Sequence, residues 1–249
     1  MTFVSQSSYA TTPTSGNSLV FKQLPQADGS VPGNILGRGT RNPGDNLCGK
    51  TDTPLIALAP HLSKTIRESQ PNSDQVLSLT SAALPTFWFY TPYQPNGNLT
   101  ANFEIRQQVN GSLRRVSRQS VQIASQPGLL SVPLQDTPLA SNQRYQWVLS
   151  VQCVPSDPSA NDSVSGWIER VDSDQASNPL QPAKTAQQKV QAYAQAGLWH
   201  ETLTTIAGEL CHSDRNQAQR WFVDLMQSVN LGIVAQQPKT SLLQSCPKL

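Results

Sequence analysis

The spacing at which hydrophobic residues recur along the sequence changes near residue 177, and this change constrains the fold more than any other feature. Between residues 51 and 172, apolar side chains alternate with polar ones, which places one set on a single face of a β-strand. The clearest alternation is at Tyr145, Trp147, Leu149, Val151 and Cys153. After residue 177, apolar residues recur every three or four positions, as in amphipathic helices. The chain is therefore predicted to be mainly β with a C-terminal α part.

Turn-forming sequences divide the alternating region into about eight short strands. Asn110-Gly111 predicts a hairpin turn, and Pro127-Gly128 precedes another strand. The predicted strands are 55–59, 76–79, 86–90, 101–105, 113–123, 130–134, 145–153 and 164–171. Many short strands between turns favour an Ig-like antiparallel β-sandwich.

The helical region predicts three helices, which begin after Pro182, after Gly197 and after Ser213 or Asp214. The first two would form a hairpin of the tetratricopeptide type within a small helical bundle. A single hairpin has no neighbouring repeat to stack on, so we expect it to pack against the sheet. The predicted organisation is an extended N-terminal arm and linker (1–47), a β-sandwich domain (48–175) and an α-helical C-terminal domain (176–249).

Low charge excludes several classes of protein. Only 14% of the residues are charged, and 28 Ser, 27 Gln, 18 Thr and 14 Asn supply most of the polarity. A net charge of +2 is too small for a dedicated nucleic-acid surface. No apolar run approaches the roughly 18 residues that span a bilayer, so no membrane insertion is expected.

Four widely spaced cysteines favour two structural disulfides formed outside the cytoplasm. Of the three possible pairings, Cys48–Cys153 and Cys211–Cys246 keep each pair inside one predicted domain. The alternative is four buried free thiols in a cytoplasmic protein. The sequence begins without a signal peptide, and we expect that a leader has been removed. The expected location is extracellular or at the cell surface, with the periplasm as second choice.

No catalytic residue, metal site or cofactor is predicted. The three histidines, His61, His200 and His212, do not share the one-face spacing of metal ligands, and no nucleophile-elbow sequence is present. A hydrolase remains the alternative, and it requires a deep polar pocket that joins His61 or His200 to a serine or carboxylate.

Two groups of residues are candidates for binding a partner, either an envelope protein or a polysaccharide. Trp88 and Tyr90 share one face of their strand, whose alternative role is core beneath the helices. Arg114, Arg115 and Arg118 lie with Arg106 around the predicted hairpin turn. Such a cluster suits an anionic polysaccharide or lipid head group, although solvated hairpins also carry arginines.

The Ser/Thr-rich arm suggests self-assembly, because it holds two strand-like pieces, 2–4 and 18–24, but cannot form a core of its own. Donation of a strand to the next subunit would form a head-to-tail homopolymer, a filament outside the cytoplasm. The predicted interface residues are Phe3, Val4, Leu19, Val20, Phe21 and Leu24. If the arm instead folds back on its own sandwich, the protein is a monomeric envelope-binding module.

Several landmarks resemble a known family. They include the aromatic block Pro85–Tyr93, the Tyr145–Trp147 and Gly166–Val171 strands, and the helical stretch Tyr193–Leu203. The chain resembles, over roughly residues 37–230, a mainly cyanobacterial family catalogued as domain of unknown function nine-two-eight. Members of that family look exported, which supports a disulfide between Cys48 and Cys153. The resemblance implies no activity and brings no catalytic residues.

Overall fold

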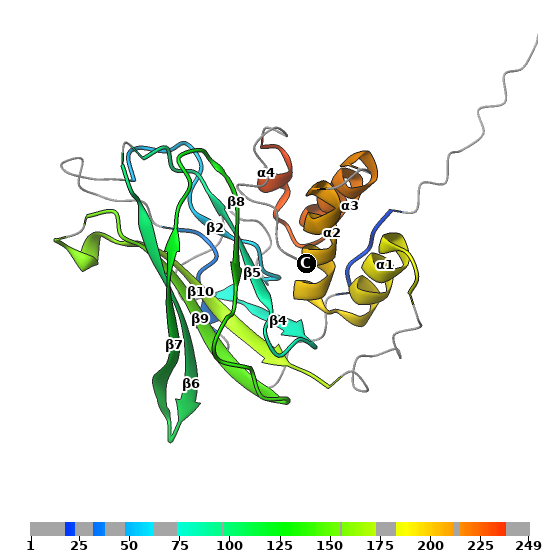
Figure 1. Ribbon diagram of the computed structural model, residues 1–249, viewed down its shortest axis with the longest axis horizontal. Coiled ribbons are helices and arrows are strands. Elements are labelled where there is room, and N and C mark those ends of the chain that lie inside the picture. Colours follow the sequence, from blue (N-terminus) through cyan, green and yellow to red (C-terminus); the bar gives the residue numbers. More distant parts are fainter. Residues whose placement is uncertain are drawn as a thin grey trace, which may run out of the picture.

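A computed structural model describes residues 18–22, 32–37, 48–61, 74–95, 97–154, 156–172, 183–211 and 215–237 (Figure 1). Four of the predicted site residues lie outside these ranges, namely Phe3, Val4, Leu24 and Cys246.

Two main sheets form a sandwich-like β part, as the alternating pattern predicts. The larger sheet has the strand order β4-β10-β9-β6-β7, and the smaller has the order β2-β5-β8. The bounds of the larger sheet's strands are β4 Leu77–Thr80, β10 Asp162–Arg170, β9 Gln143–Val151, β6 Thr100–Val109 and β7 Ser112–Gln122. Those of the smaller sheet are β2 Ile56–Ala57, β5 Thr86–Thr91 and β8 Gly128–Pro133. A third, two-stranded sheet pairs β1 Pro32–Gly33 with β3 Asp74–Gln75.

The core between the sheets is aromatic. The rings of Phe87 in β5 and Phe103 in β6 lie with centroids 4.7 Å apart, and those of Phe89 and Trp147 are 5.8 Å apart. Gly166 in β10 lies opposite Trp147 in the ladder, and a Cβ atom there would fall 2.5 Å from the indole ring. The large indole can pack at this position because the facing residue has no side chain.

The strand pairing departs from the expected antiparallel sandwich at one edge. β10 pairs with β4 in parallel, with Trp167 opposite Leu77, whereas its pairing with β9 is antiparallel. Alternating hydrophobicity is the same for both directions, so the sequence pattern does not distinguish them.

Part of the predicted arm belongs to the sandwich. The amide of Asn34 donates to the carbonyl of Ser165 at 2.9 Å, which continues the pairing on the β4 side of β10. Ile35 is fully buried, and its carbonyl accepts from the amide of Ala57 at 2.8 Å. The sandwich therefore includes residues from before the predicted boundary at residue 48.

The helices begin and end close to the predicted positions. α1 (Ala186–Ala196) starts with a capping box between Thr185 and Gln188 and ends at Gly197, whose φ of 73° suits glycine. The others are α2 (Trp199–Cys211), α3 (Arg215–Ser228) and the short α4 (Gly232–Ala235), and a 3₁₀ turn, η2, spans Pro158–Ala160. None of the described helices has the length and apolar character needed to cross a membrane.

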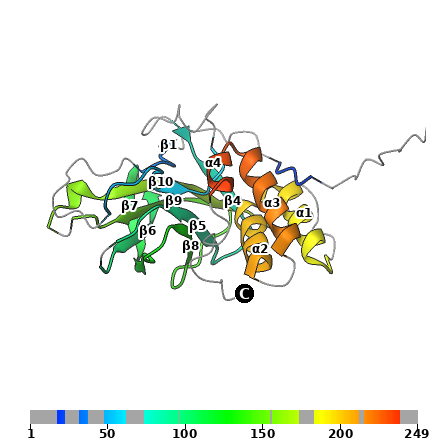
Figure 2. The ribbon, with the colours of Figure 1, turned by 90° about the horizontal axis from the view of Figure 1, so that it is seen from above.

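Buried side chains of the helices and of the sandwich belong to one hydrophobic core. Figure 2 shows the helices beside the sheets. α2 lies against β4 and β5, and the fully buried Trp199 donates from its indole N–H to the carbonyl of Leu58 at 2.8 Å. The helical part therefore packs directly on the β part, as expected for a hairpin without neighbouring repeats.

Candidate functional site

The start of α2 joins the two sheets through the side chain of His200. Its Nδ1 lies 2.9 Å from the carbonyl oxygen of Thr86 in β5, and its Nε2 lies 2.8 Å from the Ser78 hydroxyl in β4. A carbonyl oxygen can only accept, so Nδ1 carries the proton and Nε2 accepts from Ser78. One imidazole thus links an edge strand of the larger sheet to the central strand of the smaller one.

The imidazole is held neutral. Burial lowers the pKa of His200, and this effect exceeds the opposing effects of the Thr86 hydrogen bond and the Glu201 charge. A serine that donates to a neutral histidine is also the beginning of a hydrolytic site. However, Ser78 is 1% exposed and His200 is 5% exposed, so the hydroxyl is closed off from solvent. In this arrangement the pair connects elements of the fold.

Glu201, the next residue, ties α2 to the turn that follows β4. Its Oε1 accepts from the hydroxyl of Thr80 at 2.8 Å, from the amide and hydroxyl of Ser81 at 2.7 and 3.0 Å, and from the amide of Ala82 at 3.0 Å. Burial and the charge of Glu201 raise the pKa of the nearby Tyr193 phenol. No local sequence pattern pairs His200 and Glu201 with β4, because about 120 residues separate these two residues from that strand.

Trp88 and Tyr90 do not form a binding surface. Both are buried beneath the helical part, with exposures of 2% and 4%. The Trp88 indole donates to Thr204 of α2, and the Tyr90 hydroxyl donates to Gln237 beyond α4, each at 3.0 Å. The prediction of an exposed aromatic platform is therefore wrong, because the helices cover this face of β5.

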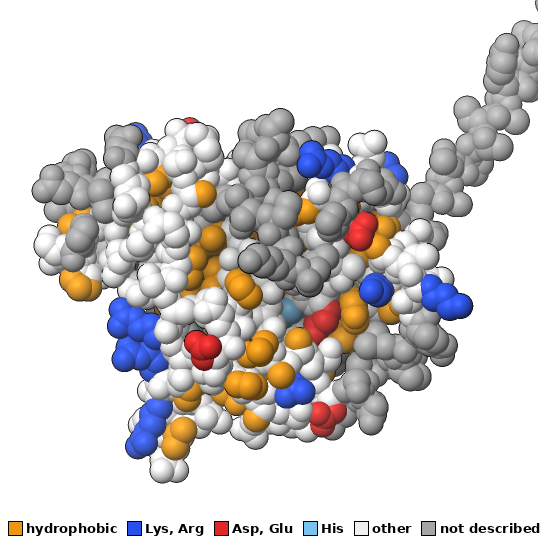
Figure 3. Space-filling model, viewed as in Figure 1, with side chains coloured by type: hydrophobic (Ala, Val, Ile, Leu, Met, Phe, Trp, Pro, Cys, Tyr) orange, Lys and Arg blue, Asp and Glu red, His pale blue; other side chains and the backbone are white. Residues whose placement is uncertain are grey.

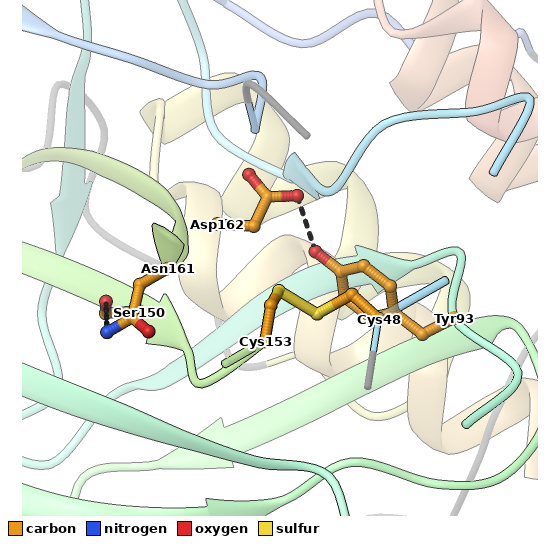
Figure 4. Close-up of a disulfide and its surroundings, with 6 residues drawn as sticks. All are labelled: Cys48, Tyr93, Ser150, Cys153, Asn161 and Asp162. Atoms are coloured by element: carbon orange, nitrogen blue, oxygen red, sulfur yellow. Dashed lines mark hydrogen bonds between the residues drawn. A yellow bond between two sulfur atoms is a disulfide. The ribbon is translucent and has the colours of Figure 1, made fainter. Parts of the chain in front are cut away.

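The predicted disulfide between Cys48 and Cys153 is present (Figure 4). It ties the segment before β2 to the end of β9. The Tyr93 hydroxyl donates beside it to the carboxylate of Asp162 at 2.6 Å, and burial together with that charge raises the pKa of Tyr93. Cys211 is also disulfide-bonded, while its predicted partner Cys246 lies outside the described residues.

Three arginines of the β6–β7 hairpin surround Glu104 on the outer face of the larger sheet. Their nitrogens lie 2.7 Å (Arg106), 3.2 Å (Arg115) and 3.8 Å (Arg118) from the carboxylate. Burial raises the pKa of Glu104, but the hydrogen bonds and charges of Arg106 and Arg115 outweigh it and lower the pKa. Since one carboxylate offsets only one guanidinium, positive charge remains at the surface. We call Arg106, Arg115 and Arg118 the arginine cluster.

The arginine cluster faces solvent. The side chains of Arg115 and Arg118 are 53% and 48% exposed, and that of Arg106 is 37% exposed. Arg114, the fourth predicted residue, lies opposite Gln107 and forms no ion pair with any residue that the structure describes. Figure 3 shows basic side chains gathered over this hairpin, at the left of the molecule.

Residues 18–22 pack against the chain's own helices rather than adding a strand to a sheet. Leu19 and Phe21 are buried, with exposures of 5% and 6%, whereas Val20 between them is 72% exposed. An extended segment points alternate side chains to opposite sides, so only two of these three predicted interface residues reach the helices. Donation of a strand by the earlier part of the arm stays a prediction.

A family model described as Domain of Unknown Function (DUF928) matches residues 36–239. The chain belongs to this family. No curated protein matches the chain.

The DUF928 match includes the Cys48–Cys153 disulfide, the arginine cluster and the His200 contacts. Residues 18–22 precede it, although the helices against which they pack lie inside it. The segment therefore precedes the matched residues and packs on a surface that lies inside them.

Proposed function

We propose that the protein is a non-catalytic, extracytoplasmic binding module that holds an acidic polysaccharide on the outer face of the β6–β7 hairpin. The arginine cluster is the observation that carries this proposal. Residues 100–122 contain four arginines and one acidic residue, in a chain whose net charge is only +2. Positive charge is therefore concentrated on one exposed hairpin of an otherwise weakly charged protein.

The cluster presents several N–H donors to an acidic polymer. Arg106 lies opposite Arg115 in the ladder, and Arg118 lies opposite Glu104, two residues before Arg106 in β6. All three guanidinium groups contact the Glu104 carboxylate, and because each guanidinium has five N–H donors, further donors can bind carboxylates of the polymer. A guanidinium binds a carboxylate through two parallel hydrogen bonds, and polar neighbours such as Asn102 and Ser120 suit sugar hydroxyls.

Other features support a non-catalytic role outside the cytoplasm. The Cys48–Cys153 disulfide is consistent with an oxidising compartment. The burial of Ser78 and His200 gives the one serine–histidine contact among the described side chains a structural role. A protein that only binds a ligand does not need the side chains of Ser78 and His200 at its surface.

The test measures binding of the full chain to polygalacturonate, a model polyuronate, with neutral dextran as the control polymer. The double variant Arg115→Gln/Arg118→Gln removes two charges from the cluster. We expect its affinity to fall roughly two- to thirtyfold, because each of the two lost ion pairs contributes about 0.2–1 kcal/mol. Wild-type binding should also weaken as salt rises.

Arg215→Gln/Arg220→Gln is the matched control, because it makes the same change in net charge on the exposed face of α3. We expect this variant to bind like the wild type. Equal losses in the two double variants would show a nonspecific effect of net charge and would overturn the proposed site. Equal binding of dextran and polygalacturonate would overturn the proposed ligand class.

A further inference from the structure

The five residues 18–22 lie on the helical part as a bound peptide would, beside α1 and α3 in both ribbon views (Figures 1 and 2). Each of three helices supplies a contact, and Asp224 of α3 accepts a further hydrogen bond from the Ser18 hydroxyl at 3.4 Å. The Leu19 amide donates to the Asp224 carboxylate of α3 at 2.8 Å, and the Lys22 amide donates to the Ala194 carbonyl of α1 at 3.0 Å. The Phe21 ring meets Trp199 of α2 edge-on, with centroids 5.1 Å apart. We call Ala194, Trp199 and Asp224 the docking surface.

Only residues of the segment itself make the contacts with the docking surface. Two backbone amides and two alternate apolar side chains make these contacts, which is how extended peptides are generally bound. The 72% exposure of Val20 shows that the opposite side of the segment is uncovered. Any chain that carries the same five residues can therefore make the same contacts.

The segment is connected to the domain only through residues 23–31. These nine residues include Pro25 and Gly29, and at full extension they span at most about 30 Å. The docking surface lies within the DUF928 match, whereas the segment precedes it. The surface thus lies inside the matched residues, and the segment that it binds precedes them.

We infer that the docking surface also accepts residues 18–22 of a second copy, so that two chains associate by exchanging this segment. The contacts of Leu19, Phe21 and Lys22 are the same within one chain and between two chains. The equilibrium then depends on the linker and on protein concentration rather than on new contacts. Reciprocal exchange gives a closed dimer, and exchange in series gives the head-to-tail polymer that the arm suggests. This inference is independent of the polysaccharide site, which lies on β6–β7.

The first experiment compares full-length chains by size-exclusion chromatography with light scattering, after incubation at low and at high concentration. We expect the wild type to form slowly dissociating dimers or larger species at high concentration. Val20→Ser is the matched control, because Val20 faces solvent, and it should behave like the wild type. Phe21→Ala should interconvert monomers and these species at least roughly tenfold faster, because the segment then detaches without exposing a buried ring.

The second experiment adds a fluorescent peptide of residues 16–24 to full-length Phe21→Ala and measures anisotropy. We expect saturable binding, and binding at least roughly tenfold weaker for a peptide in which Phe21 is replaced by Ser. Wild-type protein should bind less peptide, since its own segment occupies the surface.

Three results would overturn the inference. They are a wild type that stays monomeric at every concentration, a rate of exchange between monomers and larger species that Phe21→Ala leaves unchanged, and failure of folded Phe21→Ala to bind the peptide. If circular dichroism shows Phe21→Ala to be unfolded, the wild type and Val20→Ser still decide the question. Both must then associate with rising concentration, and monomers in both samples would exclude exchange.

Discussion

His200 makes the stability of the fold depend on pH. Burial lowers the pKa of its imidazole in the folded state, while in the unfolded chain the pKa is near 6.5. Below pH 6.5 the unfolded chain therefore binds a proton that the folded chain excludes, and the free energy of unfolding falls with the pH. This contribution to stability is fully present above pH 6.5, and a single group changes it by at most about 1.4 kcal/mol per pH unit.

We expect His200→Asn to reduce this dependence between pH 7 and 5. Asparagine keeps a donor for the Thr86 carbonyl but does not titrate, so the variant is less stable at pH 7 yet loses less stability on acidification. Urea denaturation of both proteins at pH 7, 6 and 5 measures the difference. Parallel pH profiles for the two proteins would mean that the neutral His200 does not limit stability in acid.

At the scale of elements, the Cys48–Cys153 disulfide holds the β part together across a sequence separation of 105. It joins the segment before β2 to the end of β9, so it links the smaller sheet to the larger one. Removing a link across so long a loop increases the entropy of the unfolded chain. We expect Cys48→Ser/Cys153→Ser to lower the free energy of unfolding by about 2–5 kcal/mol.

Urea denaturation without reductant measures this loss, because the disulfide of Cys211 then stays intact in both proteins. Reducing the wild type is the comparison, and it should lower stability at least as much, since both disulfides are lost. An unchanged midpoint in the double variant would show that strand pairing alone fixes the ends of this loop.

The individual elements could be predicted from the sequence because their signals are local. The alternation from Tyr145 to Val151 predicts β9, and the helical spacing before Gly197 predicts α1. Pairing is not local, so the parallel contact between β4 and β10 and the inclusion of Ile35 in the sandwich did not follow from periodicity. The short strands β1 and β3 have too few residues to show any period.

At the candidate sites, too, local features were predictable from the sequence and contacts between distant residues were not. The arginine cluster was predictable because its residues share one hairpin. For Trp88 the sequence allowed either an exposed binding surface or burial beneath the helices, because the outcome depends on where distant helices pack. The contact between Ser78 and His200 spans 122 positions, and no pattern at either residue indicates the other.

For the whole molecule, the question is whether the β and helical parts unfold together. Sequence analysis divides them at residue 175, yet buried side chains from both belong to one core. Trp88 of β5 bonds to α2, Trp199 of α2 bonds to the loop after β2, and His200 and Glu201 bond to β4 and the turn after it. Separating the parts would expose Trp199 and leave these polar groups without partners, which makes a partly unfolded state costly.

We therefore expect one cooperative transition. Circular dichroism at 222 nm follows the helices, near-ultraviolet circular dichroism follows the packed aromatic core, and both signals should change at the same urea concentration. Leu203→Ala removes a fully buried side chain of α2, and Leu/Ile-to-Ala changes in a core cost about 2–5 kcal/mol. If the parts are coupled, this substitution lowers the midpoint of both signals equally. A helical signal that is lost first, with the aromatic signal unmoved by Leu203→Ala, would show that the sandwich is stable without its helices.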